Sequence, residues 1–163
     1  MEKAYTGSTD DILVGAFRPH GRVDVRIVDP IAYSEAYGPF NAELIHALIR
    51  IQRKLAAQAR LEGPQGEIIS IFDSALAGPE VVGILTQALQ AMLREGRSKV
   101  GAALLIGPDV EGISIMLPAI LACYTKAGIP SRVFDKMEDA ESWIRGLIAA
   151  ACAEAEATKA VSG

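Results

Sequence analysis

The sequence has little of what catalytic, metal-binding and nucleic-acid-binding proteins need. It holds only two histidines and two cysteines, and Cys123 and Cys152 lie far apart without CxxC or metal-ligand spacing. We therefore expect reduced thiols, as in a cytoplasmic protein, and no bound metal or other cofactor. The net charge of -4 provides no basic excess to neutralise phosphates, which argues against a nucleic-acid partner.

Long apolar runs and catalytic motifs are missing too. No stretch of about 18 or more apolar residues occurs, so no membrane span is predicted, and residues 1–11 lack the apolar centre of a signal peptide. There is no GxSxG, no GxGxxG and no GxxxxGK[ST] sequence. His20 is expected in a turn and His46 on the side of a helix, so we predict no enzymatic activity and assign no catalytic residue.

What the chain does have is apolar residues, which make up 50% of its 163 residues and suffice for one sizeable core. We predict a single domain over 11–150. A flexible polar tail is expected over 1–10, and an alanine-rich helix end or tail over 151–163.

Hydrophobic periodicity predicts alternating strands and helices, and hence an α/β fold. The first strands would form an antiparallel hairpin around Pro19, His20 and Gly21, and the later, more continuously apolar strands would pair in parallel. Helices would pack on this mixed sheet, with Pro118 kinking or splitting the third of them. Phe134 and Trp143 would face each other in the core. The expected strands are 12–17, 23–28, 31–37, 67–73, 100–106 and 132–134, and the expected helices are 42–61, 79–95, 111–127 and 137–148.

Polar residues follow two of the parallel strands, at the edge where open α/β sheets bind ligands. They are Asp73, Ser74, Gly78 and Glu80 after one strand, and Asp109 and Glu111 after the next. Such carboxylates could contact a ligand or partner. The simpler interpretation is that these carboxylates interact with the positive N-terminal ends of the following helices. Because they already occupy those ends, phosphate binding there is not expected.

The chain resembles the SpoIIAA-like family of small bacterial proteins, and its residues 128–143 resemble the ending of that family. The resemblance rests on Arg132, Val133, Phe134, Glu138 or Asp139, Ala140 and Trp143, together with Gly38-Pro39-Phe40-Asn41 and Asp109-Val110-Glu111-Gly112. It covers about residues 21–148. That family is related to STAS domains and is grouped with CRAL-TRIO-like lipid-binding folds. The resemblance therefore implies a STAS-like sheet with helices packed on it.

STAS switches carry a phosphorylatable serine in a D-S-[ST]-G turn that opens a helix. The corresponding turn here has Asp73 and Ser74, but the second hydroxyl residue and the adjacent glycine are absent. We therefore predict that Ser74 is not needed as a phosphoacceptor.

These observations favour a non-catalytic regulatory or protein-interaction module of STAS-like type, with the loop 73–80 and the following helix as the partner surface. The alternative is a binder of a small apolar, lipid-like ligand, using a pocket at the carboxyl ends of the strands. An enzyme that uses the acids Asp73, Asp109 and Glu111 is a third hypothesis.

Self-association is also expected. The mean hydropathy of +0.25 is high for a domain with few aromatic residues. The apolar residues of 111–127 and 139–153 exceed what one core covers, and a homodimer would bury them.

Overall fold

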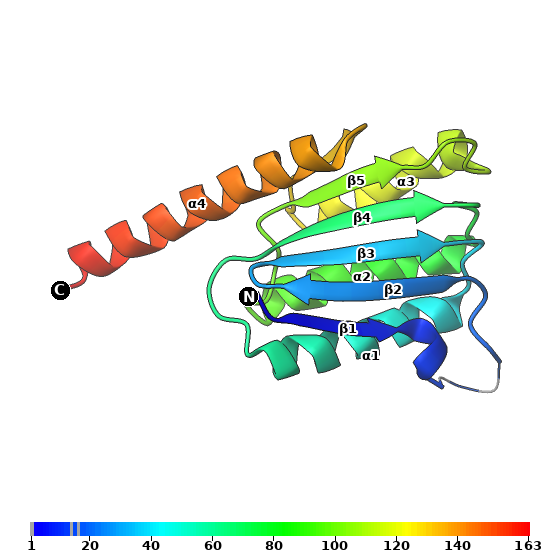
Figure 1. Cartoon of the computed structure of the whole chain (residues 1–163), viewed down its shortest axis with the longest axis horizontal. Helices are drawn as coiled ribbons and strands as arrows, with labels where there is room; N and C mark the ends of the chain where they lie inside the picture. Colours follow the sequence, from blue (N-terminus) through cyan, green and yellow to red (C-terminus); the bar gives the residue numbers. More distant parts are fainter. Residues whose placement is uncertain (1, 14, 16) are drawn as a thin grey trace.

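The computed structural model describes residues 2–13, 15 and 17–163 and arranges them as one sheet with helices on both faces (Figure 1). The sheet has six strands in the order β1-β2-β3-β4-β5-β6. The first three strands pair antiparallel, and β3 to β6 pair in parallel, which confirms the mixed α/β fold. The strands are β1 (Ala4–Ser8), β2 (Arg22–Val28), β3 (Ile31–Tyr37), β4 (Gly66–Phe72), β5 (Ala102–Ile106) and β6 (Ser131–Phe134); the helices are α1 (Ala42–Ala59), α2 (Pro79–Arg94), α3 (Ile113–Lys126) and α4 (Met137–Val161).

The two faces of the sheet are covered differently. On the inner face, α1, α2 and α3 pack against apolar side chains such as Val25 and Leu104. On the opposite face, α4 packs over β4, β5 and β6, and Ile144 lies against Ile68. On the rest of that face, over β1, β2 and most of β3, no helix of the described residues covers the strands; Ile31 and Tyr33 of β3 contact α4 at the margin. We call this surface the open face (Figure 1).

The close approach of α4 depends on glycines at the strand starts. A side chain at Gly66 would overlap Ile144, and one at Gly101 would overlap Leu147. Ile144 itself is fully buried. Beyond Ile148 nearly all the helix is exposed, and it extends away from the sheet (Figure 1). No helix of the described part of the chain is long and apolar enough to cross a membrane.

Local sequence explains where the helices begin. Asn41 precedes α1, and its side-chain oxygen accepts a hydrogen bond from the Leu44 N–H at 3.0 Å, as predicted for an N-cap. The same amide accepts from the His20 N–H at 2.9 Å and donates to the Arg18 carbonyl at 3.2 Å. Pro79 and Glu80 open α2.

The N-terminal region differs from the expectation. Residues 4–8, expected in a flexible tail, form edge strand β1, because their backbone can pair with the alternating strand β2. Of the expected strand 12–17, residues 12, 13, 15 and 17 are not in a strand, and residues 14 and 16 lie outside the described residues. The antiparallel partners of β2 are therefore β1 and β3, and the hairpin is formed by β2 and β3.

Two further helix expectations concern Pro118 and the C-terminal segment. Pro118 does not split α3, which runs without a break from Ile113 to Lys126. Pro118 is the sixth residue of that helix, so only one hydrogen bond near its first turn is lost. Of the two alternatives for residues 151–163, a helix end or a tail, the structure shows the helix: α4 continues past 148 to Val161, because alanine has the highest helix propensity.

Phe134 and Trp143 do face each other, with ring centroids 5.4 Å apart. Both are only partly buried at the margin of the α4 core. The centre of that core is Ile144. A single truncation there should therefore cost more than a truncation at its edge.

We predict that Ile144→Ala lowers the free energy of unfolding by about 3 kcal/mol, since it empties a fully buried site. Trp143→Ala should cost less than Ile144→Ala, because part of the indole is already in water. Ile115, 74% exposed, provides the control, and Ile115→Ala should change the free energy by less than about 0.5 kcal/mol. Urea denaturation measures all three; a loss for Trp143→Ala above that for Ile144→Ala would contradict this packing.

Candidate functional site

The carboxyl ends of the parallel strands meet at one edge, as the sequence predicts, and their loops are joined by backbone hydrogen bonds. The Ala75 N–H donates to the Glu111 carbonyl at 2.8 Å, and the Glu111 N–H donates to the Asp73 carbonyl at 2.9 Å. The Phe40 N–H donates to the Leu76 carbonyl at 2.8 Å. This edge is therefore a rigid, internally paired structure.

Ser74 lies inside this structure and not on its surface. The residue is only 4% exposed, and its hydroxyl accepts a hydrogen bond from the Leu76 N–H at 3.2 Å. Its carbonyl packs so closely on Gly38 that any side chain there would overlap it. The serine stabilises the turn, and that it is not needed as a phosphoacceptor stays a prediction.

The acidic residues of this edge are exposed but do not converge. Asp73 and Asp109 have left-handed backbones, with φ of 61° and 55°, and this conformation is least unfavourable for aspartate and asparagine among non-glycine residues. Glu80 lies in the first turn of α2, where the Gly78 backbone contacts its carboxylate. Among the described residues, no group of three histidine, cysteine or acidic side chains could hold a metal ion.

The helix-end interpretation of Asp109 and Glu111 was wrong. The third helix begins at Ile113, after Gly112 with φ of 71°, and has no acid in its first turn and no side-chain cap. The left-handed backbone of Gly112 accounts for the later start, because residues before it cannot continue the right-handed helix through that position. Of the two helix starts, only the one at Glu80 carries the expected carboxylate.

The structure also shows where the histidines and cysteines lie. His20 and His46 are exposed, in agreement with surface positions. Cys123 is buried, and its thiol donates to the Ala119 carbonyl at 3.2 Å. The small apolar neighbours of Cys152 in the sequence, like those of Cys123, predict a buried thiol. This prediction is wrong for Cys152, which is exposed on the projecting part of α4, because that part has no packing partner among the described residues.

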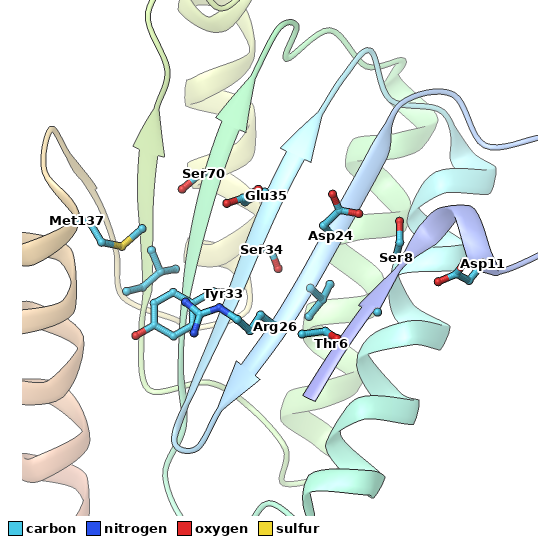
Figure 2. A pocket seen from close by; sticks show the side chains of 13 residues that line it. Thr6, Ser8, Asp11, Asp24, Arg26, Tyr33, Ser34, Glu35, Ser70 and Met137 are labelled. Atoms are coloured by element: carbon cyan, nitrogen blue, oxygen red, sulfur yellow. The ribbon is translucent and has the colours of Figure 1, made fainter. Parts of the chain in front are cut away.

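A first depression lies on the open face, at a distance along the strands from the acidic edge (Figure 2). It has a volume of about 470 Å³ and extends from β1 to the start of α4. Its lining is mainly polar, and includes Thr6, Asp24, Arg26, Tyr33, Glu35, Ser70 and Met137.

Arginine–aromatic stacks surround this depression. The Arg26 guanidinium lies 4.3 Å from the Tyr33 ring centroid, and that of Arg22 lies 4.7 Å from the Tyr37 ring. Tyr37 stacks in turn on Phe72, at 5.1 Å. Stacking of this kind holds long side chains in fixed positions on the surface.

Two carboxylates lie side by side on the same face. Asp24 on β2 is directly opposite Glu35 on β3, a like-charge pair that disfavours the sheet. Arg22 forms an ion pair with Asp24 at 3.0 Å, and the Tyr37 hydroxyl donates to Glu35 at 3.0 Å. The open face therefore combines both signs of charge with tyrosine side chains.

A second, larger groove lies on the inner side, between α1 and α2. Its volume is about 690 Å³. Ile27 and Ala32 form its floor, and the walls are apolar and rich in alanine. At the amino ends of the strands its lining becomes polar, with Gln52, Arg53, Gln65, Arg97, Ser98 and Lys99.

A buried ionisable cluster lies beside the polar end of this groove. Glu67, on β4, is 5% exposed, and its Oε1 has no hydrogen-bond partner among the described residues. Burial raises the pKa of its carboxyl, and the Lys99 charge and the Tyr124 hydroxyl oppose this rise. Burial also lowers the pKa of Lys99, whose ammonium donates to Gln65 at 3.0 Å.

Sequence reasoning missed the depression on the open face, the groove between α1 and α2, and the buried ionisable cluster. The one available signal was Glu67, an ionisable residue at the start of an otherwise apolar strand, which requires a partner when both faces are covered. The groove between α1 and α2 had no comparable signal, since alanine on a helix face is compatible with either close packing or a gap.

We predict that Ser74→Ala lowers the free energy of unfolding by about 1 kcal/mol, through loss of the acceptor for the Leu76 N–H. Ser74→Asp should cost more than Ser74→Ala, because a charge would enter a buried site. Urea denaturation tests the order. An aspartate variant as stable as the native protein would show that the turn opens readily and that the serine is accessible for modification.

We predict a pH dependence from Glu67. Its pKa is raised on folding, so between the unfolded and folded pKa values the folded chain binds more protons, and the free energy of unfolding falls as the pH rises. Glu67→Gln removes the titrating carboxyl, and with it this loss of stability at higher pH. The stability of the variant relative to the native protein should therefore increase from about pH 4 to about pH 7.

Urea denaturation across this pH range measures the difference, with the exposed Glu62→Gln as the matched control. A difference in the free energy of unfolding between Glu67→Gln and the native protein that stays constant with pH would contradict a raised pKa of Glu67.

Comparisons with protein-family models, with curated proteins and with solved structures found no match to this chain. The resemblance to SpoIIAA-like and STAS proteins therefore stays a prediction from the sequence.

Proposed function

We propose that this chain is a non-catalytic protein-interaction module, and that the open face binds a second copy of the same chain. The observation that carries the proposal is the concentration of arginine and aromatic side chains on an uncovered sheet face. Arg22, Arg26, Tyr33, Tyr37 and Phe72 stack on one another there. Arginine and tyrosine are the residue types enriched at interface hot spots.

The side chains of the open face are partly held in place before any partner binds. The Tyr33 hydroxyl donates to Glu141 of α4 at 2.8 Å, and burial together with Glu141 raises the pKa of Tyr33. The ring of Tyr33 also supports the Arg26 guanidinium at 4.3 Å. Side chains fixed in this way lose less conformational entropy on association.

The charges of the open face favour a second copy as the partner. Two-fold symmetric interfaces pair one patch with itself, so the patch must be self-complementary. Asp24 lies on β2 between Arg22 and Arg26, and Glu35 lies beside Asp24 on β3. In a face-to-face dimer with a small offset, the Arg26 of each copy would meet the acidic pair of the other, which relieves the like-charge repulsion within one chain.

This surface replaces the loop 73–80 in the proposal. That loop has its backbone groups paired with neighbouring loops, and Ser74 is buried. The open face offers a larger continuous set of side chains without backbone rearrangement.

The test is a charge swap, measured by sedimentation velocity at tens of micromolar. The native chain should sediment as a dimer. Arg26→Glu and Glu35→Arg should each shift the protein toward the monomer, because each places like charges across the interface. The double variant, Arg26→Glu with Glu35→Arg, should restore the dimer.

Lys54→Glu provides the matched control, since it reverses an exposed charge on α1, on the other side of the sheet. It should leave the dimer intact. A native chain that sediments at 17.3 kDa throughout, or a Lys54→Glu variant that dissociates as strongly as Arg26→Glu, would contradict the proposal.

A further inference from the structure

We propose that the groove between α1 and α2 binds a long-chain fatty acid, with the hydrocarbon chain along the apolar walls and the carboxylate at the cationic end. The site lies on the opposite side of the sheet from the open face, so the inference is independent of the proposed dimer. It also differs from the expected pocket at the carboxyl ends of the strands, because this groove becomes polar at their amino ends.

The shape of the groove suits one extended chain. Its lining on α1 runs from Ile45 to Ala57, a length of about 18 Å at the helical rise per residue. Alanines of both helices line it, where larger side chains would close the gap: Ala56, Ala57, Ala88 and Ala91. The volume of about 690 Å³ lies in the range of small-molecule sites.

The chemistry of the walls favours hydrocarbon over peptide. Between Ile45 and Ala57 the α1 lining offers one amide and one guanidinium, of Gln52 and Arg53, and the α2 lining from Leu85 to Met92 offers no polar side chain. A peptide segment would bring backbone polar groups along its whole length, and most would lose water without gaining a partner. A hydrocarbon chain carries no such groups.

Charge is confined to one end of the groove. Arg53, Arg97 and Lys99 lie there, in a chain of net charge -4. The C-terminal ends of α1 and α2 also meet at this end, and cations there offset the negative ends of the helix dipoles. The Arg97 and Arg53 guanidinium groups also form ion pairs with one exposed carboxylate.

That carboxylate is Glu95. It forms ion pairs with Arg97 and, at 3.8 Å, with Arg53, and the hydrogen bond with Arg97 lowers the pKa of Glu95. Glu95 is exposed and does not line the groove, so it holds these guanidinium groups from outside. A ligand carboxylate would compete with Glu95 for them, so neutralising Glu95 should strengthen binding.

The probe is cis-parinaric acid, a fluorescent fatty acid, titrated into the full chain below its micelle concentration. We expect saturable binding at one site per chain. Ala88→Leu fills the groove wall and should weaken binding about tenfold or more. Ala153→Leu makes the same change on the exposed part of α4 and should leave binding unchanged.

A second pair of variants tests the cationic end. Arg97→Gln should weaken binding about tenfold, by loss of a charge-assisted contact, while Lys159→Gln on α4 should not. Glu95→Gln should strengthen binding several-fold, an effect that a damaged fold cannot produce.

Palmitic acid and hexadecanol, used as competitors, separate the carboxylate from the chain. Palmitic acid should displace the probe at a concentration about tenfold below hexadecanol. Absence of saturable binding, or equal losses for Ala88→Leu and Ala153→Leu, would overturn the site. Equal potency of the acid and the alcohol, or no gain in Glu95→Gln, would overturn the assignment of the carboxylate to the cationic end.

Discussion

The pairing of β3 with β4 is the constraint on which the rest of the structure depends. β3 is antiparallel to β2 and parallel to β4, with Ile31 opposite Gly66 and Tyr33 opposite Ile68. This register directs Ile31 and Ile68 toward α4 and Ala32 toward α1. A slip of one residue would exchange the two faces and would bury Glu35 while exposing Ala36.

Both proposed surfaces follow from that register. On one side, α4 packs over β4 to β6 and touches β3 at Ile31 and Tyr33. Most of the polar residues of β2 and β3 therefore remain uncovered, and arginine and tyrosine side chains face water. On the other side, α1 and α2 pack over small residues such as Ala32, which leaves a groove between them. Binding at either surface therefore needs no catalytic group, in line with the scarcity of such groups in the sequence.

The sequence predicts the main architecture because its signals are local. The Asn41 cap, Pro79 at the start of α2 and the apolar runs of β4 and β5 each specify an element through nearby residues. Strand β1 was missed because its five residues, AYTGS, carry little intrinsic preference and are held by pairing with β2. For residues 151–163 the sequence left a helix end and a tail as alternatives, because alanine favours a helix but the segment lacks an apolar stripe that would pack on the core.

The candidate surfaces were harder to predict, since they depend on distances between elements. Asp73 and Asp109 were correctly placed at one edge, but the hydrogen bonds that join their loops depend on how the strands align. The stack of Arg26 on Tyr33 requires the β2–β3 register, and the groove requires the spacing of α1 and α2. Glu67 alone could have been singled out from the sequence, as an acid within a covered strand.

The claim that the open face is where two copies meet can be measured directly by electron–electron double resonance. Cys152 is replaced by serine, Cys123 stays buried, and a spin label is attached at position 6 on the open face or at position 87 on the outer side of α2, after Thr6→Cys or Gln87→Cys. The account predicts an intermolecular distance for the label at 6 that is clearly shorter than for the label at 87. The reverse order, or no dipolar signal between copies at either position, would contradict it.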